Sequence, residues 1–208
     1  MRTNAVRTIT RLIAIGAVIG GVAIAGVGSS AQSLSARETG RSVQRALERL
    51  PYYGVFDFMA FNVDRGVVTL TGYAYLGSLR HAAEAVTKRT SGVDEVANRV
   101  ELLPASQNDD RIRWQTFYRI YTDAFLSRYA PGGPDQIRRE LYDSQRFPGM
   151  HQPLGMYAIH IIVRNGHTTL FGVADNEGDK QIAEVRAREV SGVFSVENEL
   201  VVPKKDNK

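Results

Sequence analysis

The sequence predicts an α/β (α+β) protein built of two tandem small modules, each a three-stranded mixed sheet with helices on one face. Two observations predict this class. The chain carries the same pattern twice, a hundred positions apart. Within each copy, alternating apolar residues typical of strands surround a stretch of helical spacing. A length of 208 residues provides room for two small domains.

The two copies align without a gap. The first, "GVVTLTGYAYLGSLRHAAEAVTKRTSGVDEVANRVEL", begins at Gly66, and the second, "GHTTLFGVADNEGDKQIAEVRAREVSGVFSVENELV", begins at Gly166. About a third of the positions are identical, which indicates two copies of one module. The identities in the first copy, each with a partner one hundred positions later, include Gly66, Thr69, Leu70, Gly72, Ala83, Glu84, Gly92, Val96 and Asn98.

Each module is predicted to contain a β-hairpin. Arg65-Gly66 and Asn165-Gly166 are turn pairs that tolerate positive φ. Strand alternation about the turns assigns a core face to Met59, Phe61, Val63, Val68 and Leu70 in the first copy, and to Ile159, Ile161, Val163 and Leu170 in the second. The opposite face carries Ala60, Asn62, Thr69 and Thr71. One apolar and one mixed face predict a sheet covered on a single side.

A helix and a last strand follow each hairpin. Residues 78–89 and 178–189 have helical spacing and end before a Ser-Gly pair. Alternating apolar residues then predict strands near 96–102 and 196–202. Ahead of the first hairpin, "RSVQRALERLP" predicts a helix that ends at Pro51. The predicted order is helix, strand, strand, helix, strand.

These motifs resemble the BON domain, a small α/β module named for bacterial osmotically inducible and nodulation proteins. The family is marked by "G-x-V-x-L-x-G", a helix and "G-V-x-x-V-x-N". The first copy matches with "GVVTLTG" (66–72) and "GVDEVAN" (92–98). The second matches with "GHTTLFG" (166–172) and "GVFSVEN" (192–198), except that Thr168 stands in place of the valine. The resemblance implies an exported envelope protein that binds phospholipid and supports envelope integrity or stress tolerance. A protein-interaction module that assembles with another envelope component is the alternative.

The predicted organisation has four parts. Residues 1–31 form a signal peptide, 40–104 a first BON-like domain, 105–112 a linker, and 113–203 a second BON-like domain with an insertion at about 130–155. The insertion lies between Gly/Pro turns and is predicted to contain a short helix from Pro134 to about Ser144. The leading helix of the second copy, "RIRWQTFYRIYTDAFLSRYA", is longer and more aromatic than that of the first.

The N-terminus has the three parts of a secretory signal. Arg2, Arg7 and Arg11 precede an uncharged run, and small residues at Ser29 and Ala31 offer a cleavage site. An uncleaved membrane anchor is the alternative; in either case the rest of the chain is expected in the periplasm. The whole chain has 26 basic and 22 acidic residues, and three of the basic ones lie in residues 1–31. The remaining chain therefore has 23 basic and 22 acidic residues. A net charge of +1 gives little electrostatic attraction to the phosphates of nucleic acid, so the sequence does not predict nucleic-acid binding.

No residue pattern predicts an enzyme, a cofactor or a metal site. The chain has no cysteine and no "G-x-S-x-G" motif. His81, His151, His160 and His167 do not converge, and His160, on the mixed face, is expected to be a polar surface residue. Glu84 and Glu184 are expected to be solvent-facing helix charges. The repeated glycines are explained as turn and helix-end residues.

The aromatic helix provides the candidate site. Six rings fall close to one helical stripe, and four arginines flank them: Trp114, Phe117, Tyr118, Tyr121, Phe125 and Tyr129, with Arg111, Arg113, Arg119 and Arg128. This combination suits an anionic phospholipid or membrane surface, with Trp114, Tyr118, Arg113 and Arg119 as contacts and both arginines facing water. The alternative is that the rings pack on the sheet, with Tyr121 and Phe125 buried and Trp114 nearer the surface.

Overall fold

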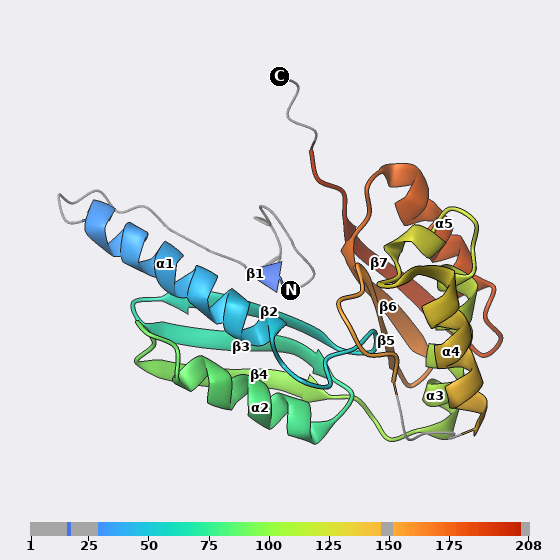
Figure 1. Cartoon of the computed structure of the whole chain (residues 1–208), viewed down its shortest axis with the longest axis horizontal. Helices are drawn as coiled ribbons and strands as arrows, with labels where there is room; N and C mark the ends of the chain where they lie inside the picture. Colours follow the sequence, from blue (N-terminus) through green and yellow to red (C-terminus); the bar gives the residue numbers. More distant parts are fainter. Residues whose placement is uncertain (1–15, 18–28, 147–151, 205–208) are drawn as a thin grey trace, which may run out of the picture.

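The computed structural model describes residues 16–17, 29–146 and 152–204, and shows two α/β modules that follow one another along the chain (Figure 1). The predicted signal peptide, residues 1–31, lies almost entirely outside the described residues. His151 of the predicted insertion also lies outside them.

The first module has the predicted order. It consists of α1 (Ser29–Glu48), β2 (Phe58–Asp64), β3 (Val67–Ala74), α2 (Gly77–Lys88) and β4 (Glu95–Leu102). β2 and β3 are antiparallel and β3 and β4 parallel, which makes the sheet mixed. A two-residue strand that the sequence did not predict, β1 (Gly16–Ala17), pairs in parallel with β2 at Ala60 and Phe61.

The second module repeats this order and adds two elements. It consists of α3 (Gln107–Tyr121), η1 (Ser127–Tyr129), α4 (Gly133–Arg146), β5 (Ile159–Arg164), β6 (His167–Val173), α5 (Glu177–Arg188) and β7 (Ser195–Val201). Its sheet has the same antiparallel and parallel pairs, β5–β6 and β6–β7. The predicted helix within the insertion is confirmed as α4.

The predicted hairpins and their core faces are confirmed. Phe61 pairs with Leu70, and Ile161 with Leu170, at the centre of each hairpin. Arg65 and Asn165 have φ of 47° and 51°, and the glycine after each is also at positive φ, as a two-residue turn between right-twisted strands requires. The side chains assigned to the core face are buried: Met59, Phe61, Val63, Val68, Leu70, Ile159, Ile161, Val163 and Leu170.

The repeated glycine inside each second strand has a different role from the one predicted. Gly72 and Gly172 lie within β3 and β6 at φ of 117° and 119°. A Cβ on Gly72 would overlap the carbonyl oxygen of Phe58, and one on Gly172 that of Ala158. These glycines therefore allow the two hairpin strands to approach closely, rather than forming a turn or a helix end.

The helices α1 and α2 pack on the first sheet, and α3 and α5 on the second. α3 begins at Gln107, inside the segment predicted to be a linker, because Ser106 accepts a hydrogen bond from the Asp109 N–H (3.2 Å) and caps the helix. α3 also takes the place that α1 has in the first module. Gly92 lies against Thr39 of α1, and Gly192 lies against Arg111 of α3.

The two modules are joined by a segment that precedes β2. We call residues 53–57 the junction segment. The Ile161 N–H donates to the Val55 carbonyl (2.8 Å), and the Val55 N–H donates to that of Pro153 (3.0 Å). Val55 and Phe56 are buried in the hydrophobic core of the second module, although they belong to the first in sequence. The second module is therefore completed by residues of the first.

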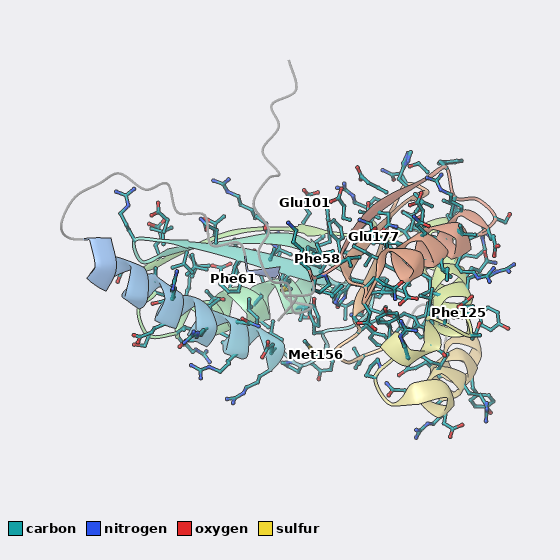
Figure 2. All side chains as sticks on the ribbon, turned by 90° about the horizontal axis from the view of Figure 1, so that it is seen from above. Phe58, Phe61, Glu101, Phe125, Met156 and Glu177 are labelled. Carbon is teal, nitrogen blue, oxygen red and sulfur yellow. The ribbon has the colours of Figure 1, made fainter. Side chains whose placement is uncertain are left out.

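The mixed faces of the two sheets meet beside this segment. The ring of Phe58, labelled in Figure 2, lies at this contact. Its centre is 4.3 Å from that of the Phe171 ring, and the two rings are stacked. The expectation that His160 is a surface residue is wrong, because its side chain is fully buried. The centre of its ring lies 5.4 Å from that of Tyr53 and 6.0 Å from that of Phe58. The sequence pattern placed His160 on the correct face, but the first module covers that face.

Candidate functional site

The aromatic residues of α3 and of the turn after it divide into a buried and an exposed set. Phe117, Tyr121 and Tyr129 are buried in the core of the second module. Tyr118 is 50% exposed and Phe125 is 61% exposed. Of the six aromatic residues of the candidate site, Tyr118 and Phe125 are therefore the two exposed ones.

Trp114 lies between these sets. Its ring is half-buried and meets Phe56 of the junction segment at 5.5 Å and Phe117 at 5.7 Å, edge to face in both cases. The ring is thus nearer the surface than Phe117, as expected. Its contacts are with the first module and the core.

The expectation that Arg113 faces water is wrong. Its side chain is fully buried, donates to the Val163 carbonyl (2.7 Å) and pairs with Asp110 (2.5 Å). Its guanidinium also lies 5.4 Å from the ring centre of Tyr75 in the first module. Helical spacing alone could not indicate this burial, because the group that covers Arg113 comes from the other module. Arg113 holds the junction and does not belong to a surface site.

The expectation that Phe125 is buried is also wrong, because α3 ends at Tyr121. One carboxylate oxygen of Asp123 accepts hydrogen bonds from the Phe125 N–H (2.8 Å) and the Leu126 N–H (3.3 Å). Burial alone would raise the pKa of Asp123, but these bonds and the Arg186 guanidinium hold it below its usual value. This turn buries Leu126 and leaves Phe125 outside.

Arg119 is exposed as predicted. Half of its side chain is accessible, and it makes a long ion pair with Glu189 (3.5 Å). Arg111 is also exposed and lies on the same helix, two turns before Tyr118. We call the exposed group Arg111, Tyr118, Arg119 and Phe125 the α3 face. Figure 2 shows Phe125 on the side of the second module away from the first.

The repeated glutamates were expected to face solvent, and this expectation is wrong in part. Glu84 accepts hydrogen bonds from Lys88 (2.5 Å) and from Asn98 (3.1 Å), and Glu184 has equivalent bonds from Arg188 and Asn198. These bonds lower the pKa of both carboxyls. Both glutamates therefore fix a helix to a strand.

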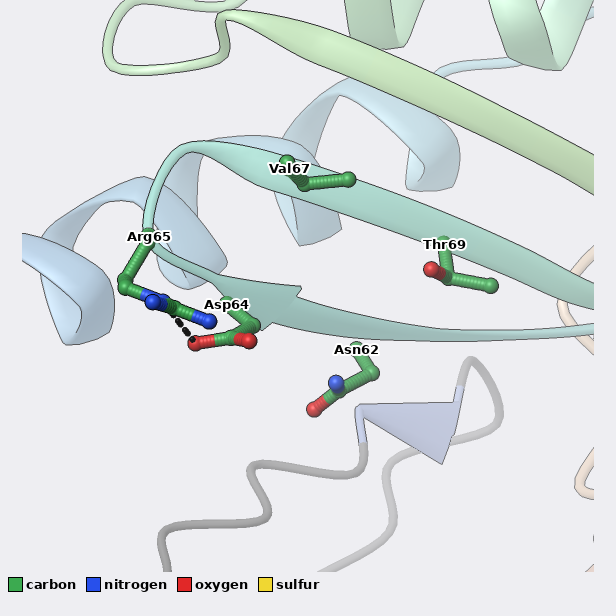
Figure 3. Close-up of a pocket in the computed structure, with 5 residues that line it drawn as sticks. All are labelled: Asn62, Asp64, Arg65, Val67 and Thr69. Carbon is green, nitrogen blue, oxygen red and sulfur yellow. Dashed lines mark ion pairs between the residues drawn. The ribbon is translucent and has the colours of Figure 1, made fainter.

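The described surface includes shallow depressions, of which two bear on the candidate residues. One, of ≈ 460 Å³, lies on the mixed face of the first sheet and is lined by Asn62, Asp64, Arg65, Val67 and Thr69 (Figure 3). Its charged groups, Asp64 and Arg65, pair with one another at 3.4 Å. The other, of ≈ 250 Å³, lies along α2 beside His81, Glu84, Ala85 and Lys88. Neither arrangement places a nucleophile against a base.

No group of three or more histidine, aspartate or glutamate side chains in the described part of the chain could hold a metal ion. Among the same residues, no helix is both long and apolar enough to cross a bilayer.

The residues that the sequence could not assign to a site have identifiable signals. Thr122-Asp123 is a helix-stopping pair within the aromatic stripe, and it marks the point after which helical spacing no longer predicts burial. The apolar run around Val55 and Phe56 indicates burial, but carries no information on which module buries it.

Comparison with known proteins gives a family match. The family model described as "BON domain" matches residues 41–104 and 136–204, which is more than half of the chain. The second match begins inside α4, so it leaves out α3, the helix that packs on the second sheet. No curated protein matches the chain.

Two solved structures are similar at low identity. Both are of CdsD, a structural protein of the type III secretion system of Chlamydia trachomatis, and the second is of its C-terminal domain. They cover 81% and 79% of this chain and 94% and 96% of their own, with 12% identity in each case and TM-scores of 0.26 and 0.24.

Proposed function

The chain belongs to the BON domain family, and on that premise we propose that it is an exported envelope protein that binds anionic phospholipid surfaces peripherally. BON domains are found in membrane- and phospholipid-associated envelope proteins and are binding modules rather than catalytic ones. In this chain the proposed contact is the α3 face, and the proposed role is support of envelope integrity under stress.

The observation that carries the proposal is the exposure of Tyr118 and Phe125 beside arginines. Rings at headgroup level together with cations that meet lipid phosphates are typical of peripheral membrane sites. Arg111 supports this reading because its hydrogen-bond partners Asn108, Gln115 and the Ser191 carbonyl are neutral, which leaves its charge available.

The arrangement differs from the one predicted from the sequence in two residues. Arg113 and the greater part of Trp114 are used at the junction between modules, and Phe125 replaces them on the surface. Anchoring α3 through these two residues holds the exposed ring of Tyr118 in place, since the helix is fixed on the sheet and on the first module. A preorganised surface loses little conformational entropy on binding.

Vesicle flotation of the exported chain, without residues 1–31, tests this function. We expect the protein to float with vesicles of phosphatidylglycerol and phosphatidylcholine, and not with phosphatidylcholine alone. Salt should weaken the binding, because surface charges are screened over roughly 8–10 Å at moderate ionic strength. Replacing Tyr118 and Phe125 by Ser should weaken it at least about tenfold, given ~1.5–3 kcal/mol for each buried ring.

A matched control comes from the first module. Tyr52 is 63% exposed, close to the value for Phe125, and Tyr52→Ser should bind vesicles like the unchanged chain. Equal flotation of the control and of the double variant would exclude the α3 face. Failure of the unchanged chain to float with anionic vesicles would reject membrane binding and favour assembly with another envelope protein.

Export is tested separately. The three-part N-terminus predicts that protein isolated from the native envelope lacks residues 1–31. Intact-mass measurement distinguishes the cleaved chain from a full-length chain in the membrane fraction, which would indicate an uncleaved anchor instead.

A further inference from the structure

The turn between α5 and β7 exposes a phenylalanine. Phe194 is 75% exposed. Its ring lies against Gly166 of the hairpin turn and meets His167 edge to face at 5.8 Å. One side of the ring is therefore supported by the protein, while most of its surface faces solvent.

The first module provides an internal control for this position, because its equivalent residue is Asp94. The Asp94 N–H donates to the Gly66 carbonyl (2.8 Å), and the Phe194 N–H donates to that of Gly166 (2.9 Å). Each side chain also covers the glycine of its hairpin turn. The same backbone turn thus forms with a carboxylate or with a ring, so the turn itself does not require the ring.

Two arginines lie at the ends of this turn. Arg111 of α3 donates to the Ser191 carbonyl (3.2 Å), and Arg188 of α5 donates to that of Val196 (3.4 Å). Arg188 shares its charge with Glu184 (2.7 Å). The partners of Arg111 named above are neutral, so Arg111 supplies the stronger positive field beside Phe194.

Arg111 also connects this turn to the α3 face. It lies seven residues before Tyr118 on the same helix, so both side chains project from one side about 10 Å apart along the axis. The turn with Phe194 lies at the N-terminal end of this stripe, and Phe125 lies beyond its C-terminal end. Exposed rings thus occur at both ends of the helix.

We propose that Phe194 is a second lipid contact, inserted at the acyl boundary of an anionic bilayer while Arg111 meets a lipid phosphate. This inference rests on the proposed function and extends it. Contact at Phe194 and at the Tyr118–Phe125 end sets the tilt of α3 relative to the membrane plane, because two separated contacts define a line along the helix. Ring insertion beside a cation is the arrangement typical of interfacial binding.

The test uses the exported chain without residues 1–31 and vesicles of phosphatidylglycerol and phosphatidylcholine. The substitution introduces the residue that the first module has at this position. Phe194→Asp should melt close to the unchanged chain, since Asp94 occupies the same backbone, and should bind the vesicles at least about tenfold more weakly. Phe194→Trp should retain binding, and its added emission should be quenched by lipid brominated near the headgroup end of the acyl chain.

The outcomes separate this inference from the proposed function. If Phe194→Asp binds like the unchanged chain while the Tyr118 and Phe125 double variant does not, Phe194 is not a contact and the α3 face remains one. If Phe194→Trp binds but is not quenched by brominated lipid, Phe194 does not enter the bilayer. If the unchanged chain fails to bind, both are rejected.

Discussion

Asn98 and Asn198 occupy matching positions in the two modules and make the same three hydrogen bonds. The Nδ2 of Asn98 donates to the Arg80 carbonyl (3.1 Å) and to Glu84 (3.1 Å), and its Oδ1 accepts from the Val100 N–H (3.2 Å). One side chain thus joins α2 to β4 at two points.

The second module repeats each contact. The Nδ2 of Asn198 donates to the Lys180 carbonyl (2.8 Å) and to Glu184 (3.2 Å), and its Oδ1 accepts from the Leu200 N–H (3.3 Å). The final asparagine of the motif "G-V-x-x-V-x-N" therefore has a structural role in both copies. It fixes the helix to the edge strand of the sheet.

Replacing either asparagine by Leu should destabilise the chain by about 1–3 kcal/mol, because a half-buried carbonyl, amide and carboxylate lose their partners. Urea denaturation measures the change. Glu197→Gln, an exposed neighbour on the same strand as Asn198, serves as the control and should have little effect. A change below about 0.5 kcal/mol in both asparagine variants would contradict the role assigned here.

Phe56→Ala should destabilise the second module although Phe56 precedes the first sheet. Loss of a buried phenylalanine costs about 3–5 kcal/mol. The effect can be followed through Trp114, the only tryptophan of the chain, whose ring lies 5.5 Å from that of Phe56. Tyr52→Ala, at an exposed position in the same loop, should unfold like the unchanged chain. An unaltered Trp114 transition in Phe56→Ala would mean that the modules are stable independently.

Asp57 should make stability depend on pH. Its fully buried carboxylate accepts hydrogen bonds from the Gly54 N–H (2.9 Å), the Tyr75 N–H (2.6 Å) and Gln152 (2.6 Å). Burial nevertheless raises the pKa of Asp57 to about 6. A folded pKa above the unfolded value, about 3.9, means that the folded state binds more protons between these two values.

The contribution of Asp57 to the free energy of unfolding should therefore be complete below about pH 4 and be lost as the pH rises through 6. A pKa difference of about two units between the folded and unfolded states makes this loss roughly 3 kcal/mol. Asp57→Asn lacks this titration. The difference in unfolding free energy, unchanged chain minus Asp57→Asn, should decrease from pH 4 to pH 7 in urea denaturation. A difference that stays constant, or that grows with pH, would contradict the direction of the shift.

Arg113 and Arg119 should respond differently to the same substitution. Arg113→Met removes a buried cation and leaves the Val163 carbonyl and Asp110 without their partner, so we expect a loss of about 2–4 kcal/mol. Arg119→Met breaks one exposed ion pair and should change stability by less than about 0.5 kcal/mol. Thermal or urea unfolding of the two variants side by side checks this. Equal free energies of unfolding for the two variants would contradict the burial of Arg113.

The parts of this fold that the sequence could predict are those determined by local chemistry. The turn pairs at Arg65 and Asn165 define their hairpins, because few residue pairs accept positive φ twice in succession. Alternation along β2 and β5 then assigns Phe61 and Ile161 to the core face. Because the module is repeated, each strand is represented by two different sequences. The apolar positions that both copies share define the register.

The parts that could not be predicted depend on contacts between modules. Arg113 and His160 have the polar character of surface residues, and each lies against a ring of the first module, Tyr75 for Arg113 and Tyr53 for His160. No period within α3 or β5 contains that information. The same holds for the candidate site. Arg113 is not part of that site because it is buried at the junction between the modules, and Phe125 is part of it because the turn at Asp123 leaves its ring exposed.

The docking of the junction segment also sets an order for biosynthesis. Phe56 and its partner Gln152 are 96 positions apart, so translation at roughly 5–20 residues per second separates their synthesis by several seconds. During that interval the Val55 and Phe56 side chains have no core to enter. A ribosome-bound first module would thus expose an apolar segment that stays uncovered until the second sheet is complete.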